Sequence, residues 1–357
     1  MSIINNINQI LAPHLKEDGF SGVILLKTEN RTLFSRAWGW AHRGFKVPNT
    51  PDTRFDTASI TKLFTSVAIL QLADKGLLKL EDKITAYLEL KDTAISPEVT
   101  LYQLLTHTSG IGDDADEEDG EDYEELWKSR PNYMVRETED LLPQFMHKPA
   151  KFAPGEGCRY NNAAYILLGL AVEKATGIKY RDYVKRNVFD KAGMKATEFV
   201  SMDGIHPLAA EGYKRVVGEG RQGVVYRKNI YSYPPVGSPD GGAFTTAEDL
   251  DRFIRAIKAG VLLSEKSTRE IMAPKALYRS LEDRDVKMGY GFEFITSKEN
   301  EVLRIQKDGC NPGVACFFAY YPQKDLTLSL LSNVDWDVWK MARELHPLLL
   351  SEELLLA

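Results

Sequence analysis

Segments with the pattern of β-strands lie at both ends of the chain and are separated by a long helical stretch. Residues 20–27 and 32–40 alternate or run apolar on either side of a four-residue turn. Residues 302–307, 314–321 and 326–333 do the same, as three consecutive antiparallel strands would. This order predicts one antiparallel sheet assembled from both ends of the chain. The predicted fold class is therefore α/β (α+β), with helices flanking the sheet.

The stretch between the two groups of strands predicts a second, mostly helical unit. Its apolar residues follow a helical period from about residue 80 to about residue 200. The chain of 357 residues is long enough for two domains, or for one large domain with an insertion. We expect residues 1–80 and 205–357 to form the sheet domain and residues 81–204 to form a helical insert. A functional site is expected in the cleft between them, where pockets commonly occur.

Composition and charge exclude several classes of protein. Hydrophobic residues make up 43% and charged residues 27%, as in ordinary soluble globular proteins. The longest apolar runs fall far short of the ~20 residues that cross a bilayer, so no membrane span is expected. A net charge of −6 argues against a nucleic-acid partner. The oligomeric state stays open.

Neither cysteine chemistry nor a secretion signal is evident. The cysteines Cys158, Cys310 and Cys316 are odd in number and contain no Cys-x-x-Cys pair, so we expect no disulfide framework and no zinc site. No metal or other cofactor is predicted. Residues 1–11 have the pattern of an amphipathic helix rather than of a signal peptide, which favours a cytoplasmic protein. A signal that was trimmed from the sequence remains an alternative.

One segment concentrates negative charge. Ten of the thirteen residues 113–125 are acidic. A calcium loop is excluded, because Gly120 in the sixth position would put Ala115 and Leu126 in ligand positions. The simpler interpretation is a solvated, mobile surface loop. The alternative is an acidic lip that attracts cationic substrates to a nearby site.

The run Ser59-Ile-Thr-Lys62 is the only Ser-x-x-Lys in the chain. It opens a segment, residues 59–75, that has a helical apolar face and ends at Gly76. Residues three apart share a helix face, so the Ser59 hydroxyl and the Lys62 amine can meet. A helix start also favours negative charge that develops on the hydroxyl. Because burial can deprotonate a lysine near neutral pH, Lys62 can act as a base toward Ser59.

Two further short patterns accompany this pair. Tyr160-Asn-Asn162 lies in a loop before a helix that is predicted from residue 163. Lys307-Asp-Gly309 ends a predicted strand, whereas the Lys-x-Gly runs at residues 191–193 and 258–260 follow helices and are predicted C-caps. Glycine at the end of a strand would let a substrate approach the sheet edge closely. Each pattern is weak alone, because matches of this length occur by chance.

Taken together, in this order and spacing, the three motifs resemble those of the serine β-lactamase and penicillin-binding-protein superfamily. The resemblance extends to Phe55-Asp-Thr-Ala-Ser59 and to residues 104–111 and 241–250, and it covers about residues 20–335. The chain looks most similar to the branch that contains class C β-lactamases, esterases and D-peptidases. This resemblance implies a β-lactamase/transpeptidase-like fold.

The resemblance also implies roles for the motif residues. Ser59 would be the acylated nucleophile, and Lys62 and Tyr160 would remove its proton. Asn162 would hold the substrate amide or Lys62. Lys307 would lower the pKa of Tyr160 and bind a substrate carboxylate. The backbone amides of Ser59 and of the residue after the third motif would form an oxyanion hole.

Two residues in and after the third motif depart from the family. The residue that follows the motif is Cys310, where many relatives have a small side chain. Relatives have Thr or Ser where this chain has Asp308, an anion that would repel a carboxylate if it faced the pocket. With Gly309, these residues complete the expected substrate-binding edge. We therefore expect a serine hydrolase acting on small-molecule or short-peptide substrates, as an esterase or D-amino-acid peptidase/amidase. The alternatives are a true β-lactamase or D,D-carboxypeptidase and a non-catalytic binding protein of the same fold.

Overall fold

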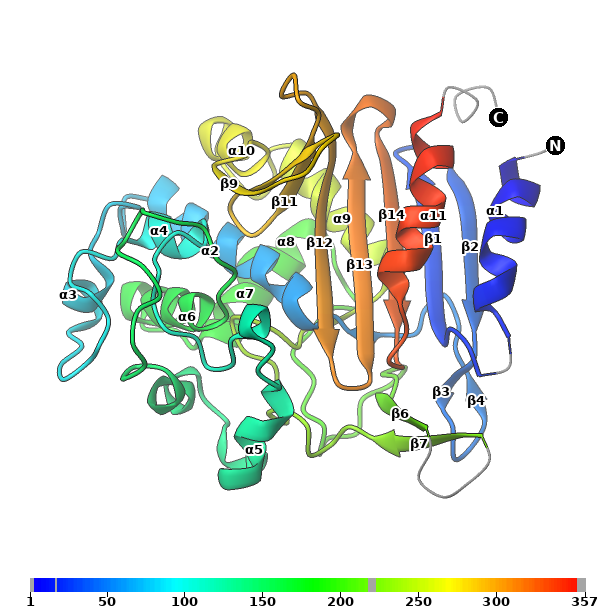
Figure 1. Cartoon of the computed structure of the whole chain (residues 1–357), viewed down its shortest axis with the longest axis horizontal. Helices are drawn as coiled ribbons and strands as arrows, with labels where there is room; N and C mark the ends of the chain where they lie inside the picture. Colours follow the sequence, from blue (N-terminus) through cyan, green and yellow to red (C-terminus); the bar gives the residue numbers. More distant parts are fainter. Residues whose placement is uncertain (1–2, 17, 218–222, 352–357) are drawn as a thin grey trace.

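The computed structural model describes residues 3–16, 18–217 and 223–351 and contains one large antiparallel sheet (Figure 1). Its eight strands run in the order β2-β1-β14-β13-β12-β11-β10-β9. Strand β1 pairs with β14, so the two ends of the chain build one sheet, as predicted. The strands are β1 (Gly22–Thr28), β2 (Thr32–Trp38), β9 (Ala276–Ser280), β10 (Asp285–Met288), β11 (Glu293–Thr296), β12 (Val302–Asn311), β13 (Val314–Tyr321) and β14 (Leu326–Ser332).

The central strands of the sheet carry apolar side chains on both faces, so both faces must be packed against helices. Every residue of β13 and β14 is buried, as expected for near-continuous apolar runs. Helices α1 (Ile3–Leu11) and α11 (Val338–Leu350) cover one face, which we call the outer face (Figure 1). Helices α2 (Lys62–Asp74) and α9 (Ala247–Lys258) pack on the opposite, inner face, where the larger apolar core lies.

The helical part lies beside the inner face and shares its core. Helices α2 and α6 pack together, and both belong to the same apolar cluster as the inner residues of the sheet. The division of the chain into two domains stays a prediction. The remaining helices are α3 (Ile84–Leu88), α4 (Leu101–Leu105), α5 (Leu126–Ser129), α6 (Ala163–Thr176), α7 (Tyr180–Val184), α8 (Asp190–Ala192) and α10 (Glu265–Ile271).

Short ribbons and turns complete the fold. The ribbons are β3 (Trp40–His42) with β4 (Val47–Pro48), β5 (Phe55–Asp56) with β8 (Phe244–Thr245), and β6 (Tyr213–Val217) with β7 (Val224–Lys228). The 3-10 turns are Ala12–His14, Ala58–Thr61, Glu117–Asp119, Tyr123–Glu125, Asn132–Met134, Thr138–Gln144 and Pro322–Lys324, and Lys185–Phe189 is a π turn. In the part of the chain described above, no helix is both long and apolar enough to cross a membrane.

Two predicted boundaries are wrong in ways that affect the site. The helix expected over residues 59–75 begins at Lys62, because Ala58–Thr61 form a 3-10 turn. The strand expected over residues 302–307 continues to Asn311, because its hairpin turn lies at Pro312 and Gly313. The third motif therefore lies inside β12 rather than at its end.

Candidate active site

Ser59 lies in the 3-10 turn that connects β5 to α2. The preceding Ala58 has a φ of 43°, a left-handed conformation that non-glycine residues rarely adopt. This turn is held from both sides. Its Ala58 N–H donates to Asp56 Oδ1 at 2.7 Å, and the Thr57 hydroxyl donates to the Ala243 carbonyl at 2.8 Å. A constrained turn of this kind is typical of functional sites.

Lys62 is fully buried one turn after Ser59. Its Nζ donates to Ser59 Oγ at 3.1 Å, to Asn162 Oδ1 at 2.7 Å and to the Asp240 carbonyl at 2.7 Å. These three acceptors match the three donors of an ammonium group. Burial lowers the pKa of Lys62 to about 8, and the positive charge of Lys307 acts in the same direction. Lys62 can therefore exchange a proton near neutral pH.

Tyr160 contacts Ser59 from the opposite side. Its hydroxyl donates to Ser59 Oγ at 2.7 Å, and its ring centroid lies 4.9 Å from Lys62 Nζ and 4.6 Å from Lys307 Nζ. The resemblance implied that Lys307 would lower the pKa of Tyr160. Instead, burial, followed by the negative charge of Glu117, raises that pKa well above its usual value. Tyr160 is therefore a neutral phenol that donates a hydrogen bond to Ser59.

Lys307 is 2% exposed and lies on the inner side of β12. Its Nζ is 3.5 Å from Glu293 Oε1 and 3.4 Å from Asp308 Oδ1. Burial alone would lower the pKa of Lys307, but these two carboxylates outweigh it, and the pKa is raised. The lysine is thus charged and already has two anionic partners within the protein.

Gly309 allows β12 to pack directly against the turn that carries Ser59. A Cβ atom at this position would lie 2.1 Å from the Thr57 carbonyl oxygen and 3.0 Å from the Ser59 nitrogen. No larger residue fits without moving the turn. Gly309 therefore permits β12 to lie close to the turn that carries Ser59. Whether a substrate also approaches Gly309 stays a prediction.

Asp308 points to the outer face of the sheet. In the register of β12 with β13 it pairs with Phe317, whose side chain belongs to the core beneath α11. Asp308 Oδ2 accepts a hydrogen bond of 2.6 Å from Trp339 Nε1 on α11. Its carboxylate is therefore held between an indole and the Lys307 ammonium and does not point freely at Ser59.

Part of the acidic segment is structural, so its interpretation as a solvated surface loop is wrong there. Asp113, Asp114 and Asp116 are buried. Asp113 accepts hydrogen bonds from the backbone N–H groups of Asn162, at 2.9 Å, and Ala163, at 2.8 Å, which lie at the start of α6. A carboxylate in this position satisfies free donors and complements the helix dipole. The segment thus positions the second motif.

Glu117 is a site residue that sequence analysis did not single out. It is exposed, and its Oε1 accepts a hydrogen bond of 3.2 Å from Asn162 Nδ2. The other contact beyond the motifs is the Asp240 carbonyl that accepts from Lys62. Asp240 directly precedes the Gly-Gly run at 241–242, which offered the one local signal for it. Nothing in the local sequence around Glu117 distinguishes it from its nine acidic neighbours.

His107 stabilises the second motif from behind. It is buried, and its Nδ1 accepts the backbone N–H of Asn161 at 3.1 Å. Its ring stacks beside Tyr160, with 4.8 Å between the ring centroids. Burial lowers the pKa of His107 well below its usual value. The histidine is therefore neutral and structural, and it does not contact Ser59.

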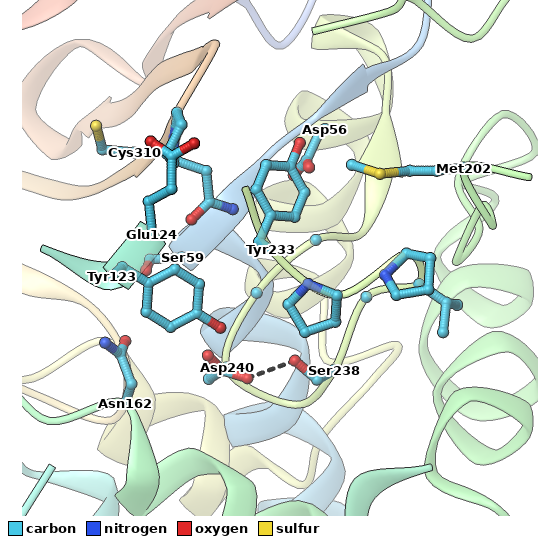
Figure 2. A pocket seen from close by; sticks show the side chains of 18 of the residues that line it. Asp56, Ser59, Tyr123, Glu124, Asn162, Met202, Tyr233, Ser238, Asp240 and Cys310 are labelled. Atoms are coloured by element: carbon cyan, nitrogen blue, oxygen red, sulfur yellow. Dashed lines mark hydrogen bonds between the residues drawn. The ribbon is translucent and has the colours of Figure 1, made fainter. Parts of the chain in front are cut away.

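Ser59 lies where two cavities meet. The first has a volume of about 450 Å³ and the second about 600 Å³, and both are lined by Ser59, Glu117 and Cys310. Figure 2 shows side chains of the first cavity converging from several elements. Lys214 is its basic lining residue and is ion-paired with a carboxylate of the same cavity. The acidic lining residues are Asp56, Glu117, Asp122, Glu124, Asp240 and Asp335.

The structure thus brings together all three motifs that sequence analysis selected. Ser59, Lys62, Tyr160 and Asn162 form one hydrogen-bonded group, and Lys307 lies beside the Tyr160 ring. Among the described residues, no three His, Cys, Asp or Glu side chains are arranged to hold a metal ion.

Comparison with known proteins agrees with this geometry. The Beta-lactamase family model matches residues 7–346, so the chain belongs to the beta-lactamase family. A penicillin-binding protein from Bacillus subtilis is 27% identical over 328 residues, which are 89% of this chain and 69% of that protein. Other relatives are longer, and the chain spans 48% to 62% of their length.

Solved structures share the fold. The crystal structure of a penicillin-binding protein from Bacillus halodurans has a TM-score of 0.87 and 34% identity, covering 96% of this chain and 99% of that one. The D-amino acid amidase from Ochrobactrum anthropi SV3 has a TM-score of 0.76 and 22% identity, with 97% of each chain covered. The β-lactamase/transpeptidase-like fold predicted from the motifs is confirmed.

Proposed function

We propose that this protein is a serine hydrolase that cleaves small esters or amides through an acyl-enzyme on Ser59. The observation that supports this most directly is the position of Ser59 Oγ. It lies 3.1 Å from Lys62 Nζ and 2.7 Å from the Tyr160 hydroxyl. A nucleophile within hydrogen-bond reach of a base, which is itself oriented by other groups, is the arrangement that covalent catalysis needs.

The proton transfers follow from the pKa directions. With a pKa of about 8, Lys62 is partly neutral near pH 7 and takes the Ser59 proton as Oγ attacks the substrate carbonyl. The backbone N–H groups of Ser59 and Cys310 stabilise the oxyanion. Tyr160 gives its proton to the leaving oxygen or nitrogen and recovers one from Lys62. A water molecule then attacks the acyl-enzyme, and the same groups return a proton to Ser59.

The charges around Ser59 favour neutral or amine-bearing substrates over carboxylate-bearing β-lactams. Lys307, which would bind a substrate carboxylate, already has Glu293 and Asp308 within 3.5 Å. The first cavity is lined by six carboxylates and one lysine that is ion-paired. An ammonium group is the complementary ligand for such a cavity. Esters and amides that carry a free amine, such as those of D-amino acids, are therefore the preferred candidates.

Covalent labelling tests the proposal. A fluorophosphonate probe should modify the peptide that contains Ser59, as located by mass spectrometry. The Ser59→Ala variant should lose labelling and lower ester turnover by roughly 10⁴-fold or more while keeping its fold. Ser66→Ala, on the same helix, is the matched control, because Ser66 hydrogen-bonds the Lys62 carbonyl and does not contact the site cavities.

A substrate screen then separates the candidate activities. It should compare p-nitrophenyl esters, D- and L-amino-acid amides and a chromogenic cephalosporin. Turnover of esters or D-amino-acid amides that depends on Ser59 would support the proposal. Labelling at another residue, or unchanged turnover in Ser59→Ala, would overturn it. A protein that turns over no substrate and takes no label would be a binding protein of this fold.

A further inference from the structure

The second cavity is a groove that starts at Ser59 and follows the outer face of β12. Side chains alternate along a strand, so those of Arg304, Gln306 and Asp308 lie on the outer face, opposite to that of Lys307. Residues of α11 line the groove on one side and residues of strands β9 and β10 on the other, and Figure 1 shows α11 and β9 on opposite sides of β12. A ligand attached to Ser59 can therefore extend along β12.

The end of the groove near Ser59 is acidic. Glu117 and Glu118 line it, and Asp308 lies on its floor. Glu118 Oε1 accepts hydrogen bonds from the Tyr278 hydroxyl of β9, at 2.6 Å, and from the Tyr160 backbone N–H, at 3.1 Å. The acidic segment thus spans the groove between the second motif and β9. An anionic group next to Ser59 would meet these carboxylates.

The far end of the groove is basic. Arg284 precedes β10, Arg304 belongs to β12 and Arg343 belongs to α11, and all three line the groove beside His346. Burial, together with the positive charges of these three arginines, lowers the pKa of His346 to about 3. His346 Nδ1 is bonded to the Tyr321 hydroxyl at 2.5 Å. Three guanidinium groups from three separate parts of the chain therefore surround one neutral histidine.

The central arginine of this cluster, Arg304, has a neutral side chain as its hydrogen-bond partner. Arg304 Nε donates to Gln306 Oε1 at 2.7 Å, and in residues 3–16, 18–217 and 223–351 no carboxylate forms an ion pair with it. Within the described residues, Arg284 and Arg343 form ion pairs only with Asp283, at 2.6 Å, and Asp337, at 3.7 Å, respectively. A guanidinium that is removed from water without a counter-ion costs free energy. The planar donors of arginine are suited to bind a carboxylate in two places at once.

We propose that this arginine cluster binds the terminal carboxylate of an elongated ligand whose other end reacts at Ser59. The proposal rests on the function proposed above and extends it to the class of substrate. Strands rise about 3.4 Å per residue, so Arg304 lies about 17 Å along β12 from Gly309, which packs against Ser59. The substrate is thus neutral or cationic at the scissile bond and anionic about 17 Å away, the dimensions of a short peptide or a long dicarboxylic monoester.

Boronic acids test this site without assuming which side of the scissile bond enters the groove, because boron accepts the serine oxygen directly. Three probes are needed: a chain that spans about 17 Å and ends in a carboxylate, its neutral N-methyl amide, and a short chain that ends in a carboxylate. The long carboxylate should inhibit ester hydrolysis about tenfold more strongly than the amide, as one charge-assisted hydrogen bond provides. The short carboxylate, which cannot reach the arginine cluster, should inhibit no more strongly than the neutral amide. Equal inhibition by the long carboxylate and the amide would overturn the proposal.

Variants locate the effect. Arg304→Gln and, separately, Arg343→Gln should each remove most of the preference for the long carboxylate and leave inhibition by the amide unchanged. Arg269→Gln is the control for net charge, because Arg269 lies on α10 outside the groove and pairs with a glutamate of the same helix. If Arg304 is only structural, Arg304→Gln will lower the melting temperature. If Arg304 serves to bind a ligand, the melting temperature of Arg304→Gln will stay the same or rise.

Two further measurements separate a failure of this site from a failure of the proposed function. Phenylboronic acid, which has no chain, reports only on Ser59, so its failure to bind would count against the function. In that case the arginine site is tested by calorimetry with a long-chain monocarboxylate whose other end is a neutral amide. Binding that weakens about tenfold in Arg304→Gln supports the site, and binding that is absent or unchanged in the variant overturns it.

Discussion

The indole Nε1 of Trp339 donates a hydrogen bond of 2.6 Å to the carboxylate of Asp308, on the outer face of β12. The other oxygen of this carboxylate is 3.4 Å from Lys307 Nζ. Asp308 therefore connects α11 to the lysine of the third motif and neutralises part of its charge. A hydroxyl in this position would leave Lys307 with Glu293 as its remaining partner at 3.5 Å.

Asp308→Thr should therefore improve the hydrolysis of carboxylate-bearing β-lactams. We expect kcat/KM for a chromogenic cephalosporin to rise by roughly tenfold relative to a neutral ester, because Lys307 gains capacity for the substrate carboxylate. Trp339→Phe is the control, since it removes the hydrogen bond but keeps the aspartate charge, and it should give no such gain. If both variants leave the ratio of the two substrates unchanged, Asp308 does not limit carboxylate binding.

Lys62 and Tyr160 contact Ser59 Oγ from two sides and should act as one proton-transfer unit. Lys62→Ala and Tyr160→Phe should each lower kcat/KM by several orders of magnitude, because either change interrupts the same transfer. The double variant should be little worse than the more severe single variant, as is found when residues act together. Losses that multiply in this double-mutant cycle would instead show that the two residues act independently.

The pH dependence should reflect the proton on Lys62. Only the neutral amine can accept the Ser59 proton, so kcat/KM should fall as the pH drops below about 8. The negative charge of Glu117 raises the pKa of Lys62, and Glu117→Gln should therefore move this limb to lower pH. Glu125→Gln, an exposed change in the same segment, should leave it in place. A profile that is flat between pH 6 and 9 would argue against Lys62 as the base, since groups near pH 8 would then not control the rate.

Much of the fold and of the motif geometry could be predicted from the sequence, because both depend on local patterns. Apolar alternation located β1, β13 and β14, and the spacing of Ser59 and Lys62 placed them on neighbouring turns. Ser59, Lys62, Tyr160 and Asn162 lie together in the structure, and their catalytic roles stay a prediction.

Other features depend on contacts between distant parts of the chain and were not predictable in this way. The pKa of Tyr160 is set by burial and by Glu117, forty-three positions earlier, rather than by the cations of the motifs. The burial of Asp113 requires the N-terminus of α6 as its partner. The arginine cluster combines three separate parts of the chain, and none of its members has a distinctive local sequence.

The charge of the first cavity yields a last prediction. Glu117 and Asp122 line this cavity and are exposed, whereas Asp113, which holds the start of α6, is buried and does not line it. We expect the double variant Glu117→Gln with Asp122→Asn to fold normally. Its substrates should be a pair of short p-nitrophenyl esters that differ only in a terminal trimethylammonium or a terminal carboxylate.

In the unmodified protein the cationic ester should be preferred by at least roughly tenfold in kcat/KM at low salt, because a cavity lined by one sign of charge concentrates the opposite sign. The preference should shrink at high ionic strength, where screening shortens the range of the field to about 3 Å at 1 M. The preference for the cationic ester should also shrink in the double variant. The Glu125→Gln variant should retain this preference, because Glu125 does not line the cavity. A ratio that neither salt nor the double variant changes would mean that the acidic lining serves the fold alone and does not select the substrate.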